Sequence, residues 1–381
     1  MKICNKKKYI VGLSGGPDSL FLLDNLIKKV NRAKIIACHV NYNFREDSEK
    51  DKNIAIEFCK KNNIAIIVKD IRKDYSNLEK NFEAWAREQR YDFFVEQLEK
   101  FNFDKILIAH NMNDDIETYL MQKQKNNLTK YWGIKKETYY KEKKILRPII
   151  EVKKSEILNY LKENSINYAI DSTNFDTKYL RNNIRSKLSE NDFEILLKEK
   201  KEQNILLKKQ YKKIYSILET DLSIKHFNKD FHFNERLLFS FFESKGFGDI
   251  FYSRKKNTLK EIIKQLMSSK SFIKIQIESL LLIKDRQYIK FINLQAYKII
   301  DKPIGLLDIN EMNYLFLKED INDFDKKLYI TNNWEYHKND LFYQDKKLNL
   351  FYKKQKTSYY FRFYQAIIYD KKNKKIKNSL N

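Results

Sequence analysis

Four apolar runs, separated by regular intervals, most constrain how the first half of this chain can fold. The runs are KYIVGL (8–13), KIIACHV (34–40), IAIIVKD (64–70) and DKILIAH (104–110). Helix-like stretches near 19–30, 50–62 and 82–100 lie between them. Apolar strands that alternate with helices are typical of a parallel sheet with helices on both faces. The first half is therefore predicted to be a doubly wound, Rossmann-like α/β domain.

The sharpest motif, SGGPDS, directly follows the first of these runs. Paired glycines let backbone N–H groups approach an anion, and the helix that follows adds a favourable dipole. The motif lacks the lysine of the common P-loop, so it predicts a phosphate cradle of another class. A polar turn without a ligand is the alternative. The predicted nucleotide-binding residues are Ser14, Gly15, Gly16, Pro17, Asp18 and Ser19.

The second half changes character after about residue 190. A helix-like run at 234–246 and an aromatic, strand-like run at 324–343 predict smaller α and α+β domains. The expected division is 1–195, 196–300 and 301–381, with the middle part mainly helical and the last part a small α+β domain. The charge run at 371–380 is expected to be a frayed end.

The net charge of +24 would attract a polyanion such as nucleic acid. Codon bias in an AT-rich genome explains a lysine-rich surface equally well, so charge alone does not establish RNA binding. The three cysteines form no C-x-x-C pair and fit a reducing compartment. No run approaches the ~20 apolar residues of a membrane span. A cytoplasmic protein that does not enter the membrane is expected.

Further polar motifs follow the other strands or lie on the helices between them. AHNMNDDIETYL (109–120) places Asp114 and Glu117 three residues apart near a predicted helix start. Their carboxylates suit a bound ammonium, a metal or a general base, although acids at helix starts are also common as caps. NFEAWAREQRYDFF (81–94) places Arg87 and Arg90 on one helix face, where they are either functional or paired with neighbouring carboxylates.

Together with HVNYNFREDSEKD (39–51), LRPII (146–150) and DSTNFDTKYLRNNIRSKL (171–188), these motifs resemble the tRNA(Ile)-lysidine synthetases of the N-type ATP pyrophosphatase (PP-loop) superfamily. The resemblance is good in the first half and weaker later. It implies that ATP adenylates the first anticodon cytidine of tRNA(Ile) with a CAU anticodon. Free L-lysine then displaces AMP, which changes codon reading from AUG to AUA and amino-acid identity from methionine to isoleucine. ATP and Mg²⁺ are the implied cofactors.

The resemblance also implies that the parts 196–300 and 301–381 bind tRNA, and it implies roles for single residues. Asp18 would be the metal-side or phosphate-side carboxylate, and Arg87 and Arg90 would be the cations at the transferring phosphoryl group. Asp114 and Glu117 would bind lysine and accept its proton. His39 and His110, at the ends of two strands, are expected to position or pack other groups, with direct catalysis as the alternative. The remaining candidates, as phosphate contacts to ATP or tRNA, are Arg45, Arg181 and Arg185.

Two departures from the family pattern stand out. Tyr42 occupies a position where a second histidine is usual, and the R-G-x-G loop after the D-D-x-E-T helix is missing, with only Gly133 in that segment. A tRNA thiolase and a non-catalytic RNA-binding relic stay open as alternatives. A homodimer is also open.

Overall fold

The computed structural model describes residues 3–44, 47–73, 75–76, 78, 81–169, 180–251 and 257–380. The chain forms two compact units, residues 1–209 and 210–381. Within the described residues, no helix has both the length and the apolar character that a membrane crossing requires.

The first unit is built on a six-stranded sheet in the order β3-β2-β1-β4-β6-β5. All of its described strand pairs are parallel except β5 with β6 at one edge. The strands are β1 (Tyr9–Gly12), β2 (Ile35–Asn41), β3 (Ala65–Asp70), β4 (Lys105–Leu107), β5 (Glu137–Tyr140) and β6 (Lys143–Leu146). The mostly parallel sheet confirms the predicted fold class, while the β5–β6 hairpin was not predicted.

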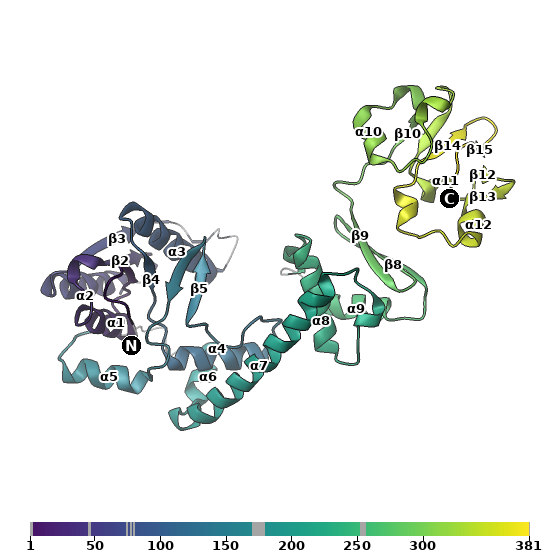
Figure 1. Ribbon diagram of the computed structural model, residues 1–381. Coiled ribbons are helices and arrows are strands. Elements are labelled where there is room, and N and C mark those ends of the chain that lie inside the picture. The colour runs from purple at the N-terminus through teal and green to yellow at the C-terminus, as the bar shows by residue number, and fades with distance from the viewer. Residues whose placement is uncertain are drawn as a thin grey trace. The chain divides into compact units, whose positions relative to one another are not determined.

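Helices cover both faces of this sheet (Figure 1). Tyr9 and Val11 of β1 point into a core shared with α1 (Pro17–Ile27), α2 (Ser48–Lys61) and α5 (Lys154–Glu163). Ile10 points into the opposite core, against α3 (Phe82–Lys100). Side chains buried in this way contribute roughly 1.5–3 kcal/mol each. The continuous apolar run of β1 is thus explained by burial on two sides.

The strand order reverses between β1 and β4, because the chain builds β2 and β3 on one side and returns to β4 on the other. Such a reversal opens a crevice at the carboxyl ends of the two strands. The SGGPDS loop follows β1, and α4 (Met112–Gln124) follows β4. The phosphate loop and the predicted carboxylates therefore border the same crevice.

Two helices complete the region beyond α5. They are α6 (Leu180–Lys187) and α7 (Phe193–Leu218). The predicted boundary at residue 195 falls within α7, which runs from the first unit into the second. The three-part division stays a prediction.

The second unit contains two helices, a three-stranded antiparallel sheet β7-β8-β9, and a six-stranded sheet in the order β10-β11-β14-β15-β12-β13 with short helices. Its first elements are α8 (Phe231–Ser244), α9 (Asn257–Leu266), β7 (Phe272–Ile277), β8 (Leu280–Asp285) and β9 (Tyr288–Asn293). The later ones are β10 (Asp301–Pro303), α10 (Ile309–Tyr314), β11 (Tyr329–Thr331), α11 (Trp334–His337), β12 (Phe342–Tyr343), β13 (Lys346–Lys347), α12 (Leu348–Lys354), β14 (Ile367–Asp370) and β15 (Lys375–Ile376).

One expectation for this unit was only partly right, and another was wrong. The run at 324–343 contains the strands β11 and β12 as expected, but the helix α11 lies between them, and Asn333 caps it by accepting a hydrogen bond from the Tyr336 N–H. The charge run at 371–380 is not frayed, because β15 pairs with β14 and Leu380 is buried. The Asn378 side chain also exchanges hydrogen bonds with the backbone of Ile368 (2.8 Å) and Ala366 (2.9 Å). Sparse apolar and amide side chains anchor a segment whose lysines face solvent.

Candidate active site

The SGGPDS loop has a backbone shape that only glycine allows at Gly15. Its φ is +84°, and a Cβ atom there would lie 2.4 Å from the carbonyl oxygen of Asp51 on α2. The Gly15 carbonyl accepts a hydrogen bond from the Ala169 N–H at 3.0 Å. The loop is thus held from both sides.

Two serines brace the loop from within. The Ser19 hydroxyl donates to the Gly16 carbonyl at 2.9 Å and lies 3.2 Å from the Ser14 hydroxyl. Helix α1 begins at Pro17, and no side chain caps it. The first N–H groups of a helix lack intrahelical partners and carry the positive end of the dipole. The loop and this helix start therefore form a cradle suited to phosphate.

Asp18, in the first turn of α1, links the cradle to α4. Its carboxylate accepts hydrogen bonds from the Asn111 side chain at 3.0 Å and from the Lys154 ammonium at 2.8 and 2.9 Å. Asn111 also caps α4, because its side chain accepts from the Asp114 N–H at 3.0 Å. The phosphate loop and the first turn of α4 are therefore held at a fixed distance.

The two predicted carboxylates of α4 share one guanidinium group, that of Arg181. Glu117, only 1% exposed, accepts from Nε of Arg181 at 2.7 Å and from Nε of Arg185 at 2.8 Å. Arg181 also bridges to Asp114 at 2.5 Å. Burial raises the pKa of Asp114, whereas the two carboxylates together outweigh burial and raise the pKa of Arg181. Both carboxylates are therefore paired with guanidinium groups of α6.

His110, just beyond β4, lies in a strongly positive part of the crevice. Burial lowers its pKa to about 3, with further lowering from Arg147, Arg87, Arg90 and Arg181. Nε of Arg147 donates to Nδ1 of His110 at 2.9 Å. Because arginine has no acceptor, the neutral imidazole must carry its proton on Nε2. His110 is therefore an uncharged donor among positive charges.

His39, at the end of β2, has the opposite tautomer. Its Nδ1 lies 2.9 Å from the Leu13 carbonyl, which can only accept, so Nδ1 carries the proton. Burial lowers the pKa of His39. The histidine holds the backbone just before the phosphate loop, which fits the predicted positioning role.

Comparison with known proteins decides the family. A PP-loop domain matches residues 1–191. The tRNA(Ile)-lysidine synthase of Mycoplasma mycoides is 38% identical over 99% of this chain and 98% of its own length. That of Mesoplasma florum is 39% identical over 100% and 99%, and that of Malacoplasma penetrans 34% over 76% and 90%. The chain belongs to the tRNA(Ile)-lysidine synthase family.

The structure brings most of the predicted residues to one crevice. The pKa of His110 is lowered by the charges of Arg87, Arg90 and Arg181. The pKa of Asp114 responds to Arg181 as well, and to the carboxylates of Asp18 and Glu117, so the predicted cations and carboxylates lie close enough to affect one another. The Arg87 guanidinium lies over the Tyr91 ring, 4.6 Å from its centre. Arg45 lies outside the described residues.

Two candidate functional residues were not singled out from the sequence. Lys154 contacts Asp18, and Arg147 orients His110. Arg147 stands in the LRPII motif, and Lys154 lies four residues beyond it. No local pattern indicates the partner of either residue, because each partner lies in a distant segment.

In place of the missing R-G-x-G loop, the chain has a loop around Gly133. Three successive N–H groups donate to side chains: that of Trp132 to Asn204 (2.9 Å), that of Gly133 to Gln122 (2.7 Å) and that of Ile134 to Asp115 (2.7 Å). Gly133 has a φ of +81°, and a Cβ atom there would lie 2.3 Å from Asp115 Oδ1. Polar side chains thus fix this loop.

Asp115 also forms a buried ion pair with Lys200 of α7, so we expect Asp115→Ala to loosen the loop. Removing one partner of a buried pair costs about 3–5 kcal/mol. Hydrogen exchange of the amides at 131–134 should become at least ~100-fold faster, because the free energy needed to open this loop falls by that amount. Lys201→Met, at the exposed next position of α7, is the control. Equal exchange rates in the two variants would show that the pair does not hold the loop.

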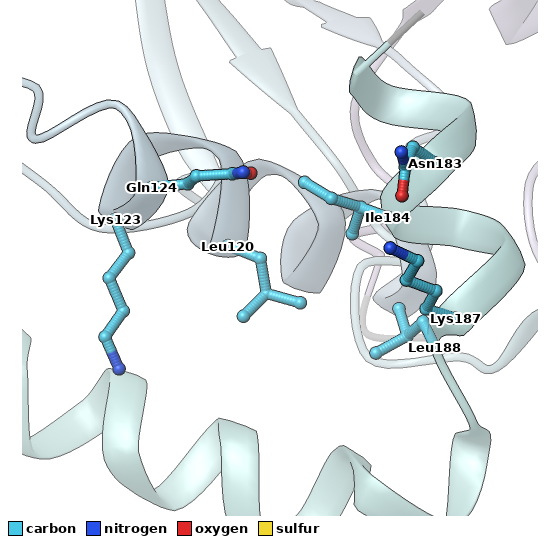
Figure 2. Close-up of a pocket in the computed structure, with 7 residues that line it drawn as sticks. All are labelled: Leu120, Lys123, Gln124, Asn183, Ile184, Lys187 and Leu188. Atoms are coloured by element: carbon cyan, nitrogen blue, oxygen red, sulfur yellow. The ribbon is translucent and has the colours of Figure 1, made fainter. Parts of the chain in front are cut away.

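A pocket of about 400 Å³ lies farther along α4 and α6 (Figure 2). Leu120, Ile184 and Leu188 form its apolar part, and Lys123, Gln124, Asn183 and Lys187 surround them. Leu120 lies one turn beyond Glu117 on α4, and Ile184 lies one turn beyond Arg181 on α6. The pocket is therefore a neighbour of the carboxylate site.

Proposed function

We propose that this protein joins free L-lysine to the first anticodon cytidine of tRNA(Ile) with a CAU anticodon. The reaction uses ATP, forms an adenylated cytidine, and releases pyrophosphate and AMP. The product tRNA reads AUA in place of AUG and carries isoleucine in place of methionine. The observation that carries this proposal is the full-length identity of 38–39% to two lysidine synthases. The convergence of the phosphate loop and the cation-binding carboxylates supports it.

The first step is attack of the cytosine carbonyl oxygen on the α-phosphorus of ATP. The loop from Ser14 to Ser19 would hold the outer phosphates, which leaves the α-phosphorus exposed to the base. Arg87 and Arg90 are positioned near His110, on the positive side of the crevice. Such cations stabilise charge on a transferring phosphoryl group.

Magnesium is expected at Asp18. Mg²⁺ in nucleotide sites is usually held by one or two carboxylates together with phosphate oxygens. Asp18 is partly exposed beside the cradle, and the described residues contain no group of three or more metal-binding side chains, so the phosphate oxygens of ATP would complete the coordination. The ion would supply charge neutralisation at the phosphates.

The second step is displacement of AMP by the lysine side-chain amine. This amine has an ordinary pKa of roughly 10.4, so the site must bind an ammonium and remove a proton. Asp114 and Glu117 pair with guanidinium groups in the structure, which supports their assignment as a cation-binding pair. We assign the lysine ammonium to these carboxylates. Arg181 and Arg185 must then move aside or share them.

The pocket of Figure 2 fits a nucleotide next to the target base. Its apolar part would pack against a base, and Lys187 would contact a phosphate. Lys187→Glu should therefore weaken tRNA binding about tenfold and reduce its salt dependence, while ATP binding stays unchanged. The control is Lys61→Glu, the same charge change at the exposed end of α2. If both variants bind tRNA equally, the pocket is not part of the tRNA site.

Among the alternatives, tRNA thiolation requires a reactive cysteine. Burial raises the pKa of Cys38 and of Cys59 to about 12, so neither thiol forms a thiolate readily. The intact loop and carboxylates argue against a non-catalytic relic. We further propose that the protein acts in the cytoplasm and that residues 196–381 contact tRNA beyond the anticodon. A homodimer stays open, and sedimentation distinguishes it from a monomer.

The direct test is lysine incorporation. Purified protein is incubated with ATP, Mg²⁺, labelled lysine and tRNA(Ile) bearing a CAU anticodon. Label should enter the RNA, and it should not enter a tRNA whose first anticodon base is changed from cytidine to uridine. Binding of tRNA without incorporation would favour the relic, and a product that requires a sulfur donor would favour the thiolase.

A further inference from the structure

The phosphate loop contains no lysine, but the fold supplies one from another helix. Lys154, 136 positions after Asp18, places its ammonium 2.8 and 2.9 Å from the two carboxylate oxygens of Asp18. Lysine is a common point charge for phosphate binding. A cation therefore stands at the edge of the cradle where the loop sequence alone shows none.

Lys154 is held in this position from two directions. It is the first residue of α5, and its N–H donates to the Asn113 side chain of α4 at 2.9 Å. Farther along α5, the Tyr160 hydroxyl donates to Asp24 of α1 at 2.5 Å, and its ring packs edge-on against Phe21. The Lys154 backbone is thus fixed to both helices that border the crevice. Its side chain remains 30% exposed, so a ligand in the cradle can reach it.

Charge balance indicates a role for Lys154 beyond its ion pair with Asp18. Partly exposed ion pairs contribute only about 0–1 kcal/mol to stability, so stability alone explains little. The Asp18 carboxylate, however, would repel the outer phosphates of ATP unless a cation offsets it. Lys154 contacts both of its oxygens, and beside a Mg²⁺ ion held by Asp18 it would add a further positive charge for the outer phosphates.

We propose that Lys154 contacts the outer phosphates of ATP and stabilises pyrophosphate as it leaves. This inference rests on the proposed function. As the cytosine oxygen bonds to the α-phosphorus, the bond from that phosphorus to the bridging oxygen breaks. Its electron pair stays on pyrophosphate, and the Lys154 ammonium, which keeps its protons, offsets the new negative charge.

Binding measurements on the full chain test this inference. Lys154→Met should weaken binding of Mg²⁺-pyrophosphate and of ATP about tenfold, and leave AMP binding within a factor of about two, because AMP lacks the outer phosphates. Lys154→Arg should restore most of the pyrophosphate affinity. Lys162→Met, an exposed lysine on the same helix, should match the wild type.

Equal weakening of pyrophosphate and AMP binding in Lys154→Met would mean that the residue only shapes the crevice, and the proposal would fall. Unchanged pyrophosphate binding would overturn it as well. Thermal unfolding of each variant shows whether the fold is intact, and Lys154→Gln provides a second neutral side chain. If the proposed function is wrong, the result differs: the wild-type protein transfers no lysine, although the comparison with Lys154→Met shows that it binds pyrophosphate through Lys154.

Discussion

Asp18→Asn should lower pyrophosphate release by at least about 100-fold, while tRNA affinity stays within a factor of about two. Loss of a single preorganised group at a developing charge typically costs that much or more. Asparagine keeps the shape of Asp18 and one oxygen for the hydrogen bonds from Asn111 and Lys154, so the crevice should persist. It removes the charge that would hold Mg²⁺. Pyrophosphate release and filter binding of tRNA measure the two effects.

Asp104→Asn is the matched control for this substitution. Asp104 also pairs with a lysine, Lys7 at 2.7 Å, but it precedes β4 and so lies at the opposite edge of the sheet from the loop. This variant should release pyrophosphate normally. If Asp18→Asn loses tRNA affinity and pyrophosphate release to the same degree, Asp18 is a folding residue rather than a catalytic one.

Glu117→Gln should reduce lysine transfer by about 100–1000-fold and leave adenylation of the tRNA within a few-fold. The substitution removes the buried negative charge assigned to the lysine ammonium. Arg181 and Arg185 remain about 40% exposed, so water can solvate them when their partner is neutral. Adenylated tRNA should therefore accumulate. Labelled ATP and labelled lysine, followed in one reaction, separate the two steps.

Glu99→Gln is the control for Glu117→Gln, since Glu99 also pairs with a cation, Lys143 at 2.8 Å, but lies in the last turn of α3, outside the carboxylate site and the pocket of Figure 2. It should transfer lysine normally. Loss of adenylation together with lysine transfer in Glu117→Gln would contradict the division of labour between the loop and α4.

Local sequence patterns predicted the parts of the site that follow the strands. The apolar runs at 8–13, 34–40, 64–70 and 104–110 become β1 to β4, because burial on two faces leaves a continuous signal. The phosphate loop follows from its glycines, and Gly15 indeed needs its positive φ. The spacing of Asp114 and Glu117 on one helix turn placed both carboxylates together, as the shared contact with Arg181 shows.

Contacts between distant segments could not be predicted in this way. The partners of Asp18, His110 and Asp115 are Lys154, Arg147 and Lys200, which the fold alone brings near. The helix at 334–337 was missed because aromatic residues there favour strands locally, whereas the Asn333 cap sets a helix. The segment 371–380 was predicted to be frayed because its lysines outnumber the few side chains that are buried there.

We expect the glycine loop to hold the outer phosphates and to leave the α-phosphorus exposed. The sharpest test uses ATP labelled at the α-phosphorus, incubated with the wild-type protein, lysine and tRNA(Ile). Label should appear in AMP, in step with pyrophosphate release and lysine incorporation. Label in ADP would place the attack at the γ-phosphorus, and the loop, the adenylated cytidine and the lysine transfer would all have to be abandoned.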